Sequence, residues 1–124
     1  MRTIAEMKET ARTFLLENGF VEYDHFHNCD SYYIPAKANI VTEHHTRYDG
    51  IEYDAKYFDG LTIEVRETYR SNGTAENQSI YFEVTRWNAS THCGRVILRE
   101  KLYSKHGAKK TASILQKVLE AYNG

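Results

Sequence analysis

The segment Leu61–Arg70 reads LTIEVRETYR, and its alternation decides the fold class. Apolar Leu61, Ile63 and Val65 alternate with polar residues, which is the pattern of a strand with one buried face. The segment therefore predicts a half-buried strand whose apolar side faces a core.

Two following segments, 79–87 and 95–104, repeat this period of two. In the first of them, Ile80, Phe82 and Val84 share one face. The connections between the segments are short, and parallel strands would need a crossover of about a dozen residues or more, so the strands are expected to be antiparallel. The apolar positions of 95–104 expected to face the core are Val96, Leu98 and Leu102.

Two Asp-Gly pairs precede these segments, at Asp49-Gly50 and Asp59-Gly60. Asp-Gly is a strong hairpin signal, because the glycine accepts the positive φ of a tight turn. We therefore expect strands near 39–48 and 51–58, with the second turn leading into Leu61–Arg70.

An earlier and shorter pair of strands is expected at Val21–His27 and Tyr32–Ile34. Pro35 indicates that the second of these is an edge strand or ends there, because proline cannot donate to a sheet.

Helical patterns stand at both ends of the chain. Thr3 and Glu6 have the spacing of a capping box, and apolar residues then recur at helical spacing until Gly19. Residues 108–122 show a second apolar stripe of helical period. The sequence predicts an α+β fold: an N-terminal helix, a curled antiparallel meander of about five to seven strands, and a C-terminal helix packed on one sheet face.

Length and composition limit the classes open to this chain. Its 124 residues predict one domain, residues 1–124. Ten Tyr, five Phe and one Trp exclude a disordered chain, which would be poor in aromatic residues. No apolar run approaches the roughly 20 residues of a membrane span, and residues 1–20 lack the apolar core of a signal peptide. We therefore expect no membrane partner and a cytoplasmic location, where Cys29 and Cys93 would be free thiols.

The formal charge of −1 is unevenly distributed. Residues 95–124 hold seven cations and two acids, a net +5, so the first 94 residues carry −6. An acidic body with a basic end predicts an anionic partner or self-association into a homo-oligomer through opposite faces. A solvated basic surface is the simpler interpretation.

One group of residues has the chemistry of a metal site. His25, His27 and Cys29 would share one face of an extended strand, and His92 lies in a second turn that could complete a tetrahedral zinc site. The sequence contains no C-x-x-C or H-E-x-x-H spacing, so histidines in turns or at the surface are the simpler interpretation. A small metalloenzyme is the hypothesis that this group supports.

The sheet face opposite the expected core carries aromatic and basic residues together. Tyr, Trp and Arg are the usual anchors of protein interfaces, although cross-strand pairs of these residues also stabilise any solvent-facing sheet. Basic residues interleaved with aromatic ones also suit bases and phosphates. The residues that we expect to contact a partner are Tyr53, Tyr57, Arg66, Arg70, Tyr81, Trp87, Arg99, Lys101 and Tyr103.

No catalytic motif accompanies this face. The sequence lacks the G-x-S-x-G of serine hydrolases and any glycine-rich phosphate loop. We therefore expect a small non-catalytic binding or accessory protein, of the inhibitor type that mobile elements often encode, with a protein as its partner. The first alternative is binding of single-stranded nucleic acid or a nucleotide by the same face and the basic C-terminal third, and the second is the metalloenzyme.

Overall fold

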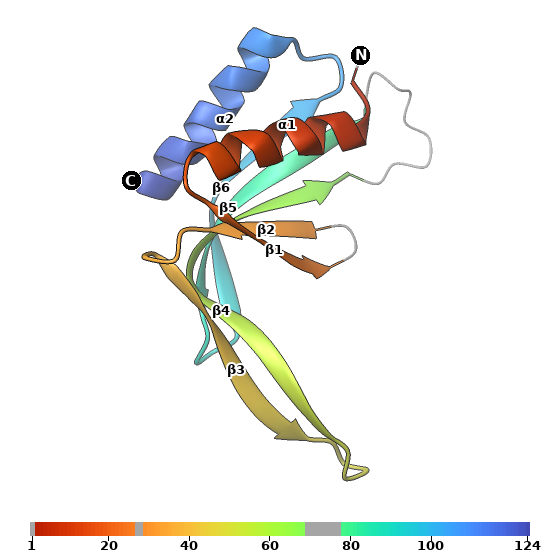
Figure 1. The fold of residues 1–124 in the computed structure, drawn as a ribbon, viewed down its shortest axis with the longest axis vertical. Helices are drawn as coiled ribbons and strands as arrows, with labels where there is room; N and C mark the ends of the chain where they lie inside the picture. Colours follow the sequence, from red (N-terminus) through yellow and green to blue (C-terminus); the bar gives the residue numbers. More distant parts are fainter. Residues whose placement is uncertain (1, 27–28, 69–77) are drawn as a thin grey trace.

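The computed structural model describes residues 2–26, 29–68 and 78–124, the side chains of residues 24–26 excepted. Within these ranges, two helices accompany one open, six-stranded antiparallel sheet (Figure 1). The α+β prediction is confirmed, with both helices against the same side of the sheet. The elements are α1 (Ile4–Glu17), β1 (Val21–Phe26), β2 (Cys29–Tyr33), β3 (Ala38–Thr46), β4 (Glu52–Glu67), β5 (Ser79–Asn88), β6 (Cys93–Tyr103) and α2 (Ala108–Asn123).

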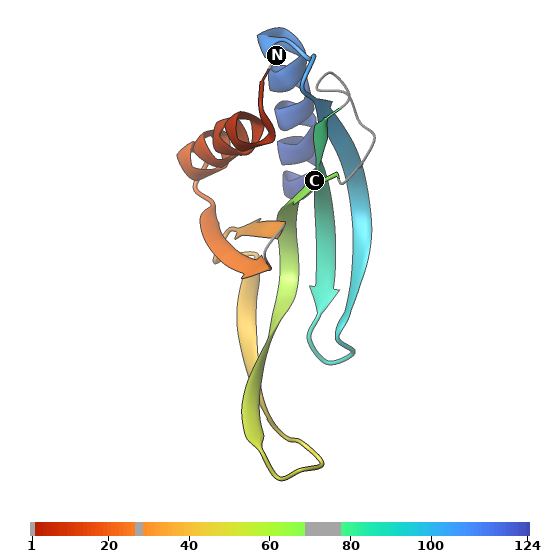
Figure 2. The same ribbon diagram turned by 90° about the vertical axis from the view of Figure 1, so that its right-hand side faces the viewer.

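The sheet runs in the order β1-β2-β4-β5-β6, and β3 pairs with the other half of β4. Residues 63–66 of β4 pair with both β2 and β5, whereas residues 52–59 pair with β3 alone among the described strands. The β3–β4 hairpin therefore leaves the body as an arm, which extends well beyond the helices (Figures 1 and 2). We call residues 38–60 the arm.

The capping box predicted for α1 is present. Thr3 Oγ1 accepts from the Glu6 amide at 3.1 Å, and Glu6 Oε1 accepts from the Thr3 amide at the same distance. These hydrogen bonds satisfy amide groups that a helix start leaves open. The hydrogen bond from the Thr3 backbone also lowers the pKa of Glu6. Neither α1 nor α2, the two helices of the described ranges, has the length and apolar content needed to cross a bilayer.

Tyr122 fixes the end of α2 to the sheet. Its side chain is fully buried, its hydroxyl donates to the Leu61 carbonyl at 3.0 Å and it accepts from the Ile34 amide at 3.0 Å. Burial raises the pKa of this phenol. Because both hydrogen bonds are made in the interior, they fix where α2 lies along β4 and the end of β2.

The helix-covered core contains the alternating residues expected of the central strands. Ile63, Val65, Phe82 and Val84 are all at most 1% exposed. The expectation that Val96 also faces this core is wrong, because it is 44% exposed. A register shift in the β5–β6 pairing is the reason, since Val84 pairs with Leu98 but the next residue, Thr85, pairs with Val96. The extra residue turns Val96 to the opposite face.

The two Asp-Gly pairs have different roles. Asp49-Gly50 forms the expected hairpin turn at the tip of the arm, where the Arg47 amide donates to the Ile51 carbonyl at 2.8 Å. The expectation of a second hairpin at Asp59-Gly60 is wrong, because β4 runs through it without interruption.

Gly60 instead lets β3 approach β4 closely. Its φ is +117°, and a Cβ atom at this position would lie 2.2 Å from the Lys37 carbonyl oxygen. Asp59 also has a non-local partner, since its Oδ1 accepts from the Ala89 amide at 3.0 Å. The Asp59-Gly60 dipeptide therefore connects the arm to the β5–β6 turn.

Candidate functional site

The sheet face away from the helices carries most of the aromatic and basic residues that the sequence analysis selected. Tyr81 pairs with Lys101, and Arg99 pairs with Glu83 in the same sheet. Tyr81, Trp87 and Tyr103 are half-buried, whereas the Arg99 and Lys101 side chains are exposed. We call this surface the helix-free face; its selected residues are Arg66, Tyr81, Trp87, Arg99, Lys101 and Tyr103.

The other three selected residues lie elsewhere. Tyr53 and Tyr57 belong to the arm, so they extend the helix-free face only at its end. Tyr53 stacks on His45, and Tyr57 stacks on His92. Arg70 lies outside the described residues.

The floor of the helix-free face is a row of alternating charges. Glu64 and Glu83 are only 3% and 7% exposed, yet both are ion-paired. Arg66 Nη2 lies 2.7 Å from Glu64 Oε2, and Arg66 Nε lies 2.9 Å from Glu83 Oε1 without the angle of a hydrogen bond. Arg99 donates to Glu83 Oε2 at 2.7 Å. Burial of a carboxylate is tolerated only with such compensation, so this row is built as a unit.

Cys29 ends the row on the β2 side. Its thiol donates to Glu64 Oε2 at 3.0 Å. Burial raises the pKa of the Cys29 thiol to about 12, and the neighbouring Glu64 carboxylate adds to the increase. Because the thiolate is the nucleophilic form, the Cys29 thiol is expected to be unreactive at neutral pH.

The two cysteines should therefore differ in reactivity. Iodoacetamide at pH 8 is expected to alkylate the exposed Cys93 at least about 100-fold faster than Cys29 in the folded protein. Peptide mass spectrometry over a time course measures both rates. Denaturant should abolish the difference, and equal rates in the folded protein would contradict the burial of Cys29.

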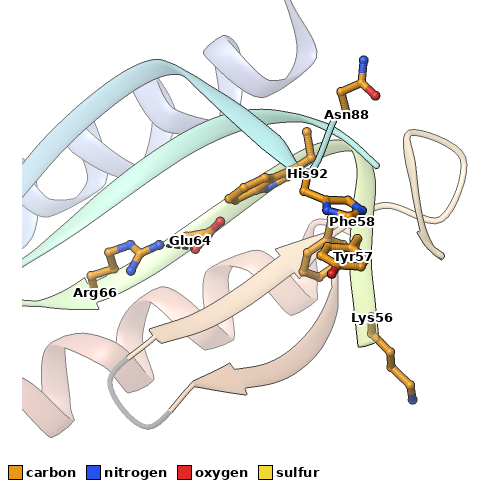
Figure 3. A pocket seen from close by; sticks show the side chains of 8 residues that line it. Lys56, Tyr57, Phe58, Glu64, Arg66, Asn88 and His92 are labelled. Atoms are coloured by element: carbon orange, nitrogen blue, oxygen red, sulfur yellow. Dashed lines mark hydrogen bonds and ion pairs between the residues drawn. The ribbon is translucent and has the colours of Figure 1, made fainter. Parts of the chain in front are cut away.

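A cavity of about 220 Å³ opens where the arm meets the body. Three aromatic rings contribute to its wall, Glu64 and Arg66 lie at one end, and Lys56 points away from the rings (Figure 3). The residues that line it are Lys56, Tyr57, Phe58, Glu64, Arg66, Trp87, Asn88 and His92. We refer to it below as the cavity.

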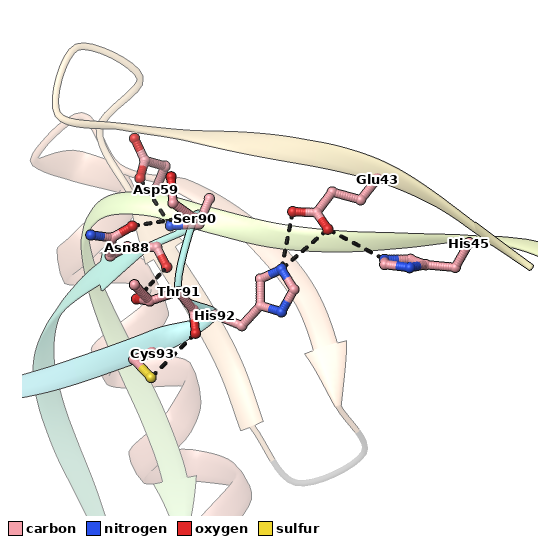
Figure 4. Close-up of polar contacts among 9 residues, drawn as sticks. Glu43, His45, Asp59, Asn88, Ser90, Thr91, His92 and Cys93 are labelled. Carbon is pink, nitrogen blue, oxygen red and sulfur yellow. Dashed lines mark hydrogen bonds and ion pairs between the residues drawn. The ribbon is translucent and has the colours of Figure 1, made fainter.

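His92, which also lines the cavity, joins the β5–β6 turn to the arm (Figure 4). Its Nε2 lies 3.0 Å from Glu43 Oε2 on β3, and its ring is parallel to that of Tyr57 at a centroid distance of 3.9 Å. The backbone of His92 has a φ of +57°, which is unfavourable for a residue with a side chain. Contacts to Glu43 and Tyr57 help to hold this conformation.

The proposed metal ligands are only partly described. The His25 side chain and His27 lie outside the described residues. Cys29 contacts Glu64, and His92 contacts Glu43 and Tyr57. Among the described side chains, those of residues 2–23, 29–68 and 78–124, no three His, Cys, Asp or Glu are arranged to hold a metal ion.

Two other histidines have pKa values displaced in opposite directions. His44 Nδ1 lies 2.9 Å from Asp54 Oδ1, and hydrogen bonds to Asp54 and Glu52 raise the pKa of His44 above 6.5. Burial, with nearby Lys110, lowers the pKa of His106, whose Nδ1 accepts from the Tyr103 amide at 3.1 Å.

We therefore expect the NMR titration of His44 to have its midpoint above that of His106. The contribution of His44 to stability is present below its unfolded pKa and is lost as the pH rises through its folded pKa. The contribution of His106 has the opposite sign: it is present above the unfolded pKa and is lost as the pH falls. Asp54→Asn should lower the His44 midpoint alone, and the reverse order of midpoints would contradict these contacts.

Sequence reasoning missed Glu43, Glu64 and Glu83 as parts of the site. Glu64 and Glu83 alternate with core residues, so they looked like ordinary solvent-facing positions. Their location directly opposite each other in neighbouring strands, beside Arg66, follows only from the register. No family model, curated protein or solved structure matches the chain, and its function is therefore inferred from these residues themselves.

Proposed function

We propose that this chain is a non-catalytic binding protein that takes a protein partner on the helix-free face. The observation that carries this proposal is the placement of both helices on one side of an open sheet, which leaves Tyr81, Trp87 and Arg99 on the other side. Arg99 lies over the Tyr81 ring at 5.7 Å, an amphipathic pair of the kind that anchors protein interfaces.

Charge favours a protein over an extended nucleic-acid strand on this face. Arg66 and Arg99 already neutralise Glu64 and Glu83, so the face offers little uncompensated positive charge. The other cations of the basic C-terminal third do not all lie on this face. Lys109, Lys110 and Lys117 belong to α2, on the opposite side of the sheet. A continuous basic track along the face, as phosphate binding needs, is not formed by these residues.

Affinity capture with matched variants tests the proposal. The bait variant Tyr81→Ala/Arg99→Ala alters the helix-free face, and Lys109→Ala/Lys110→Ala alters exposed positions of α2 as the control. We expect the wild type and the control to recover the same partner from native lysate, with recovery reduced at least about 10-fold for the face variant. Equal recovery by both variants, or no partner for the folded wild type, would overturn the proposal.

A further inference from the structure

The cavity has a buried acceptor at its inner end. The Glu64 side chain is 4% exposed, and its hydrogen bonds from the Cys29 thiol and the Arg66 guanidinium both end on Oε2. An ionised carboxylate can accept about four hydrogen bonds, two on each oxygen. Oε1 is therefore the oxygen with acceptor capacity left for a ligand.

A donor lies beside this acceptor. Arg66 follows Glu64 by two residues on the same side of β4, and its side chain is 30% exposed. Its five N–H groups exceed the contacts that Glu64 and Glu83 supply. A carboxylate next to a guanidinium matches a flat ring edge on which an amino group stands beside an accepting ring nitrogen. Adenine and cytosine have that edge.

The walls suit a flat ring. The Tyr57 ring is held from one side by its stack on His92. The Trp87 indole donates its N–H to Thr62 Oγ1 at 2.9 Å, which fixes that ring and commits its polar atom. Both rings therefore line the cavity in fixed orientations. Stacking on aromatic side chains stabilises any bound nucleobase, because every base has a π-face.

Size and charge narrow the ligand further. A volume of about 220 Å³ is below the range of pockets that hold drug-sized molecules, so it suits a single ring system. Of the charged lining residues, Lys56 points away from the rings, and Arg66 and Glu64 are paired with each other. The space between the rings therefore favours a neutral ring over a cation.

We propose that the cavity binds an amino-bearing nucleobase, adenine or cytosine, with its amino group on Glu64 Oε1 and its ring nitrogen on Arg66. The base can belong to a free nucleotide or to one residue of a single strand. The cavity shares Arg66 and Trp87 with the helix-free face, but Tyr57 and His92 line it from the arm and the β5–β6 turn, so neither ligand requires the other.

Trp87 is the single tryptophan of the chain and lines the cavity, so its fluorescence reports on occupancy. The matched probes are AMP against IMP and CMP against UMP, because each pair differs in having an amino group or a carbonyl at the tested edge. We expect saturable quenching by AMP or CMP, with binding at least about 10-fold weaker for IMP and UMP, since a carbonyl would face the carboxylate. Equal affinities within both pairs, or no saturation by any of the four up to about 10 mM, would overturn the proposal.

Two variants of the arm locate the site. Tyr57→Ala removes a wall and should weaken AMP or CMP binding about 10-fold or more, as expected for a lost stacking partner. Tyr53→Ala is the control, because Tyr53 lies four residues nearer the tip and stacks on His45 outside the cavity. Both variants alter the arm and leave the helix-covered core intact. If both variants weaken binding equally, or if neither weakens it, the ligand binds elsewhere and the proposed site is refuted.

The source of the base is decided by comparing AMP or CMP with a short oligonucleotide of the same base. An oligonucleotide that binds at least about 10-fold more tightly, with a steep salt dependence, identifies a single strand. Equal affinity identifies the free nucleotide. Affinity capture with the Tyr57→Ala bait separates this proposal from the previous one, because this variant should bind nucleotide weakly and still recover the protein partner.

Discussion

Gly60→Ala is expected to destabilise the protein by at least about 3 kcal/mol, through strain at positive φ together with a backbone clash. The new Cβ would lie 2.2 Å from the Lys37 carbonyl oxygen and 2.8 Å from the Ala38 Cα, and neither atom belongs to a side chain that can rotate away. For a chain of this length the loss corresponds to a decrease in Tm of roughly 10 °C or more. Differential scanning calorimetry measures it directly.

Gly50→Ala is the matched control for this experiment. Gly50 also has a positive φ, +84°, but a Cβ there would meet no atom within 4 Å. Only conformational strain remains, so we expect a loss of about 1 kcal/mol. Similar losses for the two variants would show that β3 does not approach β4 at Gly60 as described.

Arg66→Ala is the second change with a large expected effect. It leaves Glu64 and Glu83 buried with only Cys29 and Arg99 as partners, and removing one member of a buried charge group costs about 3 to 5 kcal/mol. Arg66 is partly exposed, so we expect the lower end, about 3 kcal/mol. Urea unfolding monitored by Trp87 fluorescence and by circular dichroism measures the change.

The surface pair Arg12–Glu22 provides the control for this variant. Arg12 Nε lies 2.6 Å from Glu22 Oε2, but the Arg12 side chain is 44% exposed. Because water screens such a pair, Arg12→Ala should destabilise the protein far less than Arg66→Ala. Adding Glu64→Gln and Glu83→Gln to Arg66→Ala should recover part of the loss, and no recovery would contradict the compensating role of Arg66.

Local patterns were enough to predict the elements of the body. Alternation identified β5 and the second half of β4, and the capping box identified the start of α1, because each signal depends on residues close in sequence. The Asp-Gly signal was right at Asp49-Gly50 and wrong at Asp59-Gly60, although the two dipeptides are identical. The difference lies in the close approach of Lys37 and Ala38, which no local pattern contains.

The candidate site was less predictable than the fold, for a related reason. Tyr81, Arg99 and Lys101 fell on the expected face because strand alternation determines their side of the sheet. The partners of the other site residues are distant in sequence: His92 is 49 residues from Glu43, and Cys29 is 35 from Glu64. Such pairings depend on register and on the direction of the arm, and so does the existence of the cavity.

The continuity of β4 through body and arm also determines how exchange with solvent should be distributed. An isolated two-stranded hairpin is marginally stable in water, but the arm shares its second strand with the centre of the sheet. Amides near Gly60 can therefore open only when the central sheet opens, whereas amides near the Asp49-Gly50 turn can fray alone. Hydrogen exchange along β4 should slow progressively from Glu52 to Ile63, and a sharp step at Gly60 would mean that the arm unfolds as a separate unit.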